Sequence, residues 1–351
     1  MVKTKSMVDV NFIVSGKITK EDVVYRNANE SPFKIYGVYH DGEKYRRMPQ
    51  EIADTVNKGV SELCANTTGG RVRFITDSPY VTIKAYVPGG PIYSHMTFTA
   101  QAGFDLYVGE GKDAYFIKSF VPPLRMTEGY ESEINLPAGE KLVTINFPLY
   151  NDVCELYIGL KEGATLLPPP DYKIEKPVVY YGSSITQGGC ATRPGLSYQA
   201  HLSRWFDMNF VNLGFSGNAK GEPEMARYLA SLDMSCLVID YDYNTPSTEW
   251  LRETYPPLFK TVREKHPTLP IIMASKPKYR LNGADLDRLE VIRNVYEQAL
   301  KAGDENVYFV DGRELMELFG DDGTIDACHP GDLGFYSMAK RFAKEFEKIF
   351  N

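Results

Sequence analysis

Residues 178–189 read Val178-Val179-Tyr180-Tyr181-Gly182-Ser183-Ser184-Ile185-Thr186-Gln187-Gly188-Gly189. The first four are apolar or aromatic, as in a strand buried on both faces, and the glycine and two serines after them are typical of a tight turn. Such a turn raises one hydroxyl above the end of the strand, and Ser184 is the residue placed to carry it. The alternative is a plain strand-to-helix turn in which Ser184 only caps the next segment.

From about Lys176 onward, strand-like and helix-like segments alternate. The pattern predicts strands at 178–182, 210–214, 236–241, 269–274 and 306–311, and helices near 197–207, 223–231, 247–265, 284–302 and 333–349. This alternation is typical of a parallel sheet with helices on both faces. Pro256-Pro257 should break or bend the third of these helices.

The first part of the chain has a different pattern. Short segments such as 71–75 and 81–87 alternate apolar and polar residues and are separated by turn residues, which predicts an all-β sandwich of jelly-roll type over residues 1–160. A proline-rich stretch at 168–170 then marks a semi-rigid connection. We therefore expect a linker at 161–176 and a second, α/β domain at 177–351.

Composition limits the partners. A net charge of -7 and a pI near 5.4 disfavour nucleic acid, which would need clustered Lys and Arg. No apolar run approaches the ~20 residues that cross a bilayer, so no membrane partner is expected. Asp9 and Asn11 interrupt any export signal, and five scattered cysteines without a CxxC pair are typical of reduced thiols. The expectation is a cytoplasmic protein; a secreted protein whose signal peptide has been removed would have the same sequence.

A carboxylate and an imidazole lie close together near the C-terminus, in Asp326-Ala327-Cys328-His329-Pro330. A serine hydroxyl is a poor nucleophile until a base takes its proton, and His329 is the strongest candidate base in a suitable loop. Asp326 would orient the imidazole and stabilise its charged form. Serine, aspartate and histidine together suggest acyl transfer.

Two further segments offer hydrogen-bond donors for a developing oxyanion. The backbone N–H of Gly217 follows the predicted strand at 210–214, and the Asn244 amide follows the one at 236–241. Ser184 N–H, Gly217 N–H and the Asn244 side chain would make a three-donor oxyanion hole. The alternatives are that Gly217 only supplies a positive φ and that Asn244 only caps the next helix.

Other kinds of site fit less well. The segment 182–189 lacks the lysine and the glycine spacing of a phosphate loop, and the five histidines show no tight ligand spacing. We therefore expect no metal and no cofactor. Cys328, beside His329, is expected to be structural.

The four segments together resemble, in order, the serine, glycine, asparagine and histidine blocks of the SGNH (GDSL-like) hydrolases, over about 178–351. The resemblance implies a flavodoxin-like three-layer fold, a serine nucleophile and no metal. The chain departs from the common pattern in two blocks. Ser183 stands where the signature has aspartate, and Asp242-Tyr243-Asn244-Thr245 lacks the glycine and the second aspartate of Gly-x-Asn-Asp.

A second resemblance lies in the first domain. Gly103-Phe104-Asp105-Leu106-Tyr107 is similar to the Gly-x-Asp-Leu-Tyr signature of a β-sandwich found before SGNH domains, and residues 188–195 resemble the stretch after the serine in that two-domain group. The resemblance implies a carbohydrate esterase with a carbohydrate-binding-like jelly roll. It suggests an intracellular acetyl esterase acting on acetylated manno-oligosaccharides or another hemicellulose fragment. The alternatives are a carbohydrate-binding protein that has lost activity and a lipase or thioesterase of the same fold.

Four residues are candidates for substrate binding. Tyr243 and Trp250 fall near predicted strand ends, Tyr93 lies with His95 on a loop of the first domain, and Arg193 follows the serine block. Packing is the competing explanation for each aromatic residue, and Arg193 could instead fix the loop after the serine.

Overall fold

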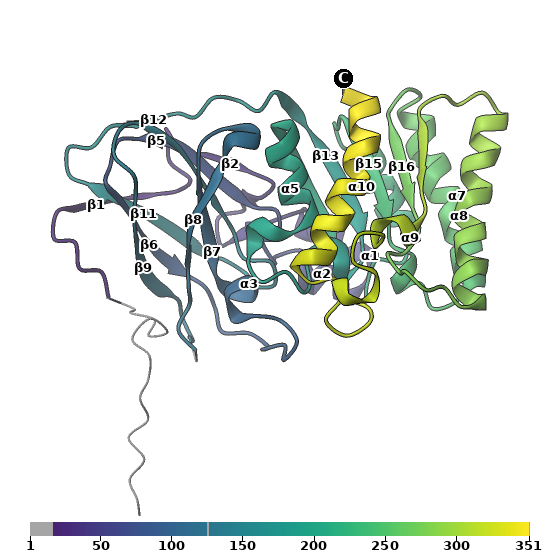
Figure 1. Cartoon of the computed structure of the whole chain (residues 1–351), viewed down its shortest axis with the longest axis horizontal. Coiled ribbons are helices and arrows are strands. Elements are labelled where there is room, and N and C mark those ends of the chain that lie inside the picture. The colour runs from purple at the N-terminus through teal and green to yellow at the C-terminus, as the bar shows by residue number, and fades with distance from the viewer. Residues whose placement is uncertain (1–16, 125, 351) are drawn as a thin grey trace, which may run out of the picture.

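The computed structural model describes residues 17–124 and 126–350; the N-terminal segment in which no export signal was predicted lies outside the described residues. A strand-rich domain and a parallel-sheet domain lie side by side, with the C-terminal helix running along the parallel sheet (Figure 1). This arrangement confirms the predicted fold class.

The strand-rich domain is a jelly roll made of two antiparallel sheets. Its strands pass repeatedly from one sheet to the other, and the apolar faces of both sheets form one core. One sheet has the order β1 (Val23–Asn27), β11 (Glu155–Lys161), β6 (Tyr80–Tyr86), β9 (Tyr130–Asn135). The other has the order β12 (Leu166–Leu167), β5 (Arg71–Thr76), β10 (Lys141–Asn146), β7 (Phe104–Val108), β8 (Tyr115–Phe120), and β2 (Lys34–Tyr36) also pairs with β5.

All five predicted parallel strands are present in the second domain. The order across the sheet is β14 (Met208–Gly214), β13 (Ile174–Gly182), β15 (Cys236–Asp240), β16 (Ile271–Ala274), β17 (Val307–Val310). The chain order reverses at β13, and ligands of such sheets bind beyond the carboxyl ends of the strands at this point. Gly182 at the end of β13 pairs with Gly214 on one side and Asp240 on the other.

Alternate residues of β13 enter different cores, as the pleat of a strand requires. Val179 and Tyr181 pack with one set of helices, and Val178 and Tyr180 pack with the other. The first set is α6 (Pro223–Ser231), α7 (Thr248–Lys265) and α8 (Gly283–Lys301). The second set is α5 (Tyr198–Phe206), α9 (Gly312–Leu315) and α10 (Asp332–Phe350).

The expected break at Pro256-Pro257 is absent, because α7 continues from Thr248 to Lys265. Both prolines are exposed, as are Arg252 and Glu253, whose carbonyls lose their helical partners. Water can bond those carbonyls, so the buried face of the helix stays intact.

Two short helices of the N-terminal region belong to the core of the parallel-sheet domain. They are α1 (Gln50–Val56) and α2 (Lys58–Leu63), and Met48, Ala53, Val60 and Cys64 pack there without exposure to solvent. Residues 48–64 therefore lie within the predicted β-sandwich region of the sequence but complete the core of the other domain.

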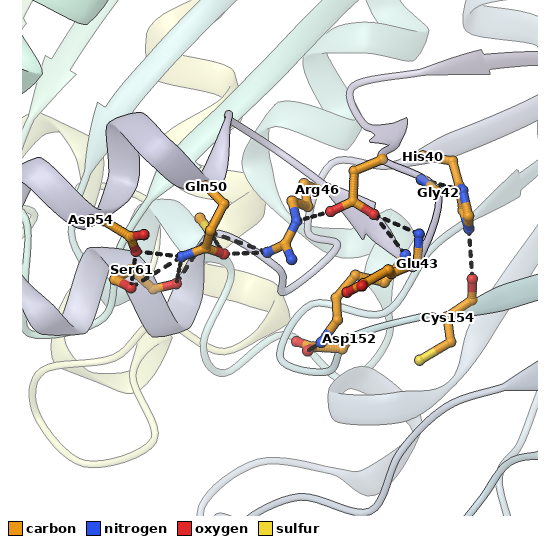
Figure 2. Close-up of polar contacts among 12 residues, drawn as sticks. His40, Gly42, Glu43, Arg46, Gln50, Asp54, Ser61, Asp152 and Cys154 are labelled. Atoms are coloured by element: carbon orange, nitrogen blue, oxygen red, sulfur yellow. Dashed lines mark hydrogen bonds and ion pairs between the residues drawn. The ribbon is translucent and has the colours of Figure 1, made fainter.

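A chain of polar contacts connects these helices to the jelly roll (Figure 2). Arg46, at the end of β4 (Tyr45–Arg46), contacts both Asp41 and the side chain of Gln50. Gln50 donates in turn to Asp54 at 2.6 Å. On the other side, His40 of β3 (Tyr39–His40) contacts the Cys154 carbonyl through Nε2 at 2.9 Å. The short β3–β4 hairpin is thus fixed at both ends.

The expected linker at 161–176 carries regular structure. It holds β12, which pairs with β5 of the jelly roll, and the first residues of β13. Lys34 and Asp171 also form an ion pair across it. The connection is therefore packed onto the jelly roll along part of its length.

Candidate active site

The turn after β13 gives its two serines different surroundings. Ser183 is fully buried; its Oγ accepts the N–H of Ile185 at 3.2 Å and its own N–H donates to the Asp240 carbonyl at 3.2 Å. Ser184 begins the short helix α4 (Ser184–Gln187) and is half-buried. Ser183 thus caps the helix, and Ser184 carries the hydroxyl that faces out of the sheet.

Gly182 permits the tight turn. A Cβ at this position would lie 2.1 Å from Thr186 Oγ1 and 2.3 Å from the Asp240 carbonyl oxygen. A larger residue would separate β13 from β15, so the strand can end here only with glycine.

Three side chains far apart in the sequence form a hydrogen-bonded chain. Ser184 Oγ lies 2.9 Å from His329 Nε2, and His329 Nδ1 lies 2.8 Å from Asp326 Oδ2. If Nδ1 carries the ring proton and donates it to Asp326, Nε2 is free to accept the serine proton. The structure thus brings together the three residues predicted as a catalytic triad.

Asp326 is held by more than the imidazole. Its Oδ1 accepts the backbone N–H groups of Cys328 at 3.1 Å and His329 at 2.7 Å. Burial alone would raise the pKa of Asp326, but the hydrogen bonds and the charge of His329 outweigh it and lower the pKa. The carboxylate therefore stays ionised and oriented at neutral pH.

The histidine loop is fixed on both sides. Ile325 N–H donates to the His329 carbonyl at 2.9 Å, and Cys190 N–H donates to the Pro330 carbonyl at 3.0 Å. The second bond joins the loop after the serine to the loop that carries the histidine. Relative movement of nucleophile and base is restricted as a result.

Gly217 and Asn244 lie on loops beyond the carboxyl ends of β14 and β15, the two neighbours of β13. Gly217 has φ 71°, and no atom lies within 4 Å of the point where a Cβ would stand. Asn244 Oδ1 accepts the N–H of Ala219 at 3.4 Å, which leaves the amide NH₂ for another acceptor. Of the two alternatives from the sequence, the one for Gly217 keeps support, because Gly217 has a positive φ. The alternative for Asn244 does not, because Ser247 caps α7.

A fully buried glutamine connects the nucleophile turn to the Gly217 loop and to the jelly-roll domain. Gln187 Oε1 accepts the N–H of Ser216 at 2.9 Å, and its Nε2 donates to Asn66 Oδ1 at 3.1 Å. The Gln187 carbonyl accepts the Thr68 hydroxyl at 2.7 Å. Sequence reasoning did not single out Gln187, because a glutamine within a serine motif gives no sign of its partners.

The jelly-roll domain reaches the nucleophile itself. Tyr150 OH donates to the backbone carbonyl of Ser184 at 3.0 Å. The Tyr93 ring lies 5.6 Å from the Tyr150 ring, and the His95 ring lies 5.4 Å from the His329 ring. The loop between β6 and α3 (Phe98–Ala102), which carries Tyr93 and His95, therefore lies beside the triad.

His95, Cys190 and His329 bring ring nitrogens and a sulfur within 4.8 Å of one another. The three come from distant segments, so no sequence spacing could reveal them. Burial, with a contribution from the charge of Asp326, raises the pKa of the Cys190 thiol to about 12. Cys190 is therefore a protonated thiol at neutral pH.

Arg193 lies in the domain interface. Its guanidinium donates to Asp105 at 2.8 Å and to the Tyr107 hydroxyl at 2.6 Å, and Asp105 also accepts the N–H of Gly195 at 2.8 Å. Asp105 and Tyr107 are the aspartate and tyrosine of the Gly-x-Asp-Leu-Tyr segment. These contacts fit the second of its predicted roles, fixing the loop after the serine.

Tyr243 and Trp250 lie on the Asn244 side of the site. Tyr243 is half-buried, in the single turn η4 (Asp242–Asn244), with the Lys276 ammonium 5.1 Å from its ring centre. Trp250 is 38% exposed, and its indole N–H donates to the Lys220 carbonyl at 2.8 Å. Trp250 thus borders the loop that follows Gly217.

Helices of the described residues are too short or too polar to span a bilayer.

Comparison with known families gives two matches. Residues 175–350 match the GDSL-like Lipase/Acylhydrolase family, and residues 23–166 match the domain described as the N-terminus of Esterase_SGNH_hydro-type. No curated protein matches the chain.

Several solved structures share both domains. A GDSL-like lipase candidate from Bacteroides ovatus is 31% identical, with a TM-score of 0.84 over 93% of this chain and 98% of that chain. The salicylyl-acyltransferase SsfX3 of a tetracycline biosynthetic pathway is 22% identical, with a TM-score of 0.77 over 94% and 98%. A family two carbohydrate esterase from Clostridium thermocellum, solved with cellohexaose, is 16% identical, with a TM-score of 0.61 over 90% and 98%. The latter two likenesses concern the fold alone.

Proposed function

The chain belongs to the GDSL-like lipase/acylhydrolase family and is an ester-bond hydrolase, and from that premise we propose that it is a serine esterase that removes O-acetyl groups from carbohydrate. The observation that carries the proposal is the continuous hydrogen-bonded chain from Ser184 through His329 to Asp326. Manno-oligosaccharides or another hemicellulose fragment are the proposed substrates.

In the first half of the reaction, Ser184 Oγ attacks the ester carbonyl carbon while His329 Nε2 takes the hydroxyl proton. Asp326 stabilises the resulting imidazolium. Ser184 N–H, Gly217 N–H and the Asn244 amide hold the oxyanion. When the intermediate collapses, His329 passes its proton to the sugar oxygen, the C–O bond breaks, and the acetyl group remains on Ser184.

In the second half, water replaces the sugar. His329 takes a proton from water as the oxygen attacks the acyl carbon, and then returns it to Ser184 Oγ as acetate leaves. No external oxidant or reductant is needed.

Rings from both domains support a sugar substrate. Tyr93 and His95 approach the triad from the jelly roll, and Tyr243 and Trp250 lie near Asn244 on the other domain. Flat rings with polar edges suit the mixed apolar and polar faces of a sugar. The proposed substrate site therefore includes residues of both domains.

The test is hydrolysis of nitrophenyl acetate by the full chain and by Ser184→Ala. We expect kcat to fall by about 10³-fold or more, because only binding and the oxyanion hole remain. Ser183→Ala is the matched control: it removes the neighbouring hydroxyl, costs about 1 kcal/mol of stability as a lost cap, and keeps the nucleophile. Normal turnover by Ser184→Ala would refute the assignment.

The substrate is tested by acetate release from acetylated mannan, xylan and pectin fragments. A nitrophenyl ester series of increasing acyl length separates the alternatives. Acetate should be the best acyl group, whereas a steep rise in kcat/KM with chain length would favour a lipase or thioesterase.

A further inference from the structure

A buried cluster of arginines lies between the two domains, away from the triad. In β5, Val72 and Phe74 point into the jelly-roll core, so the alternating Arg71 and Arg73 point to the opposite face. Both arginines are only 2% exposed, because that face is covered by the parallel-sheet domain and the segment that leads to it. The polar positions of this strand therefore face protein, not water.

The two arginines line a cavity of about 30 Å³ between β5 and α5. Arg204 of α5, which is half-buried, lines it from the parallel-sheet domain, and so does Asp207. Tyr107 of β7 and Tyr172 also line it. The lining thus brings three guanidinium groups together with one carboxylate. Asp207 is half-buried, and its Oδ2 already accepts the N–H of Lys173 at 3.0 Å.

None of the three arginines has an ion pair within the described part of the chain. Arg71 donates to neutral acceptors, among them the Tyr172 hydroxyl at 3.1 Å and Asn209 Oδ1 at 2.7 Å. Arg204 donates to the Gly195 carbonyl at 2.8 Å. Arg73 lies 4.0 Å from the Tyr172 ring centre, and its buried Nη1 has no hydrogen-bond partner among the described residues.

Such an arrangement is unfavourable without a counter-charge. A buried cation needs an opposite charge and hydrogen-bond acceptors, and like charges that share a site repel each other. Burial lowers the pKa of Arg71 and of Arg204, which shows the same conflict. Asp105, a fully buried carboxylate whose charge acts on Arg204, is already paired with Arg193.

We propose that this interdomain cavity binds a small inorganic anion that accepts from Arg73 and offsets part of the positive charge of the three arginines. One water molecule needs about 10–15 Å³ of such volume, so the cavity has room for chloride or a compact oxyanion. The ligand would connect β5 of the jelly roll to α5 of the other domain. It would act as a structural bridge, independent of the esterase reaction.

The first test uses the full-length wild-type protein and needs no variant. In chloride solution, exchange with a bound site should broaden the chloride NMR signal in a saturable way. Addition of phosphate or sulfate at constant ionic strength distinguishes the ligands: loss of the broadening identifies an oxyanion site, and its persistence identifies a chloride site. Absence of saturable broadening, together with a Tm that is the same in chloride, phosphate, sulfate and gluconate, would overturn the proposal.

The second test locates the site. Thermal unfolding at constant ionic strength should show a saturable rise in Tm of a few degrees in the small anion relative to gluconate, because a ligand of the folded state stabilises it. Arg73→Met keeps the apolar stem and removes the charge, so this response should disappear. Arg26→Met, at an exposed position of β1, should retain it. An unchanged Tm response to the anion in Arg73→Met would show that the anion does not bind in this cavity. If Arg73→Met fails to fold, the NMR measurement on the wild-type protein still decides the proposal.

Discussion

Asn244 is held in a short turn that departs from the familiar asparagine block. Its Oδ1 bonds Ala219 N–H, so its amide NH₂ is oriented by the loop that also carries Gly217. We predict that Asn244→Ala lowers kcat by about 10²- to 10³-fold, as for loss of one oxyanion donor, with KM changed much less. Steady-state kinetics on nitrophenyl acetate measure this, with an unchanged Tm as the control for folding. A normal kcat for Asn244→Ala would mean that Asn244 does not stabilise the oxyanion and only forms the hydrogen bond with Ala219.

Asp240 is a buried acid directly beneath the nucleophile turn. It is 2% exposed, its Oδ2 accepts a long hydrogen bond of 3.4 Å from the Thr186 hydroxyl, and Asp242 lies nearby. Burial, with a smaller contribution from Asp242, raises its pKa well above the usual value. Its contribution to stability is therefore complete below the unfolded pKa of about 3.9, and is lost as the pH rises toward the folded value.

The neutral isostere Asp240→Asn should therefore unfold at a higher temperature than wild type near pH 8, with the difference shrinking toward pH 4. Thermal unfolding of both proteins between pH 4 and pH 8 measures the sign of this Tm difference and its change with pH. Asp287→Asn, on the exposed side of α8, is the matched control and should follow wild type at every pH. A difference for Asp240→Asn that does not vary with pH would show that titration of Asp240 is not involved.

At the scale of elements, β7 anchors the loop that follows the serine. Asp105 is fully buried and pairs with Arg193, whose side chain is 17% exposed. Removal of one partner of a buried pair leaves the other charge unpaired, so Asp105→Asn should cost about 3–5 kcal/mol of unfolding free energy. It should also lower kcat, because the same loop bonds to the histidine loop through Cys190 and Pro330. Urea unfolding and kinetics on one preparation measure both effects.

The double variant Asp105→Asn/Arg193→Met isolates the pair. Because it leaves no buried charge, it should be more stable than the sum of the single changes implies. The exposed pair Lys58–Glu62 is the control, and Glu62→Gln should change neither stability nor kcat measurably. Strict additivity of the two changes would mean that Asp105 and Arg193 act separately.

Elements with a strong local signal were predictable from the sequence. Four consecutive buried residues before Gly182 determined β13, and the alternation of strands and helices predicted the parallel sheet. Predictions from local sequence were wrong where the structure depends on which face of an element is exposed or covered by the rest of the protein. Pro256 and Pro257 are tolerated within α7 because they lie on an exposed face of the helix. Arg71 and Arg73 alternate with core residues, a pattern typical of a strand that faces solvent, but the second domain covers them.

The same limit applies to the site. Ser184, Asp326 and His329 could be proposed because their residue types carry the chemistry and their motifs are short. Gln187 could not, because its role depends on contacts across the domain interface. The Gly-x-Asp-Leu-Tyr segment and the loop at 188–195 were both visible in the sequence, and their direct contact is what the structure adds.

At the scale of the whole molecule, the parallel-sheet domain is incomplete without the N-terminal region. Met48, Ala53, Val60 and Cys64 complete one of its cores, and Arg47 donates to the carbonyls of Asn212 at 2.9 Å and Gly214 at 2.6 Å. A fragment of residues 174–350 should therefore aggregate or unfold, although it holds the whole triad. Circular dichroism and size-exclusion chromatography test this, and a folded, active fragment would refute it.

A single substitution in the full-length chain tests the contribution of core packing by residue 48 without removing the N-terminal region. Met48→Ala should cost about 2–5 kcal/mol, as for other fully buried methionines. Leu124→Ala, at a side chain that is 76% exposed, should leave stability unchanged. Equal effects of the two changes would mean that residue 48 contributes no core packing.

The position of α1 and α2 also has a consequence for synthesis on the ribosome. Leu63 at the end of α2 emerges about 160 residues before Pro223 at the start of α6, whose core it shares. At roughly 5–20 residues per second, this interval is about 8–32 s. During that time the jelly roll can fold, but the apolar side chains of α1 and α2 stay exposed to solvent because the helices that cover them have not yet been synthesised. The nascent chain should therefore bind holdase chaperones through residues 48–64 until the nucleophile strand and its neighbours have been translated.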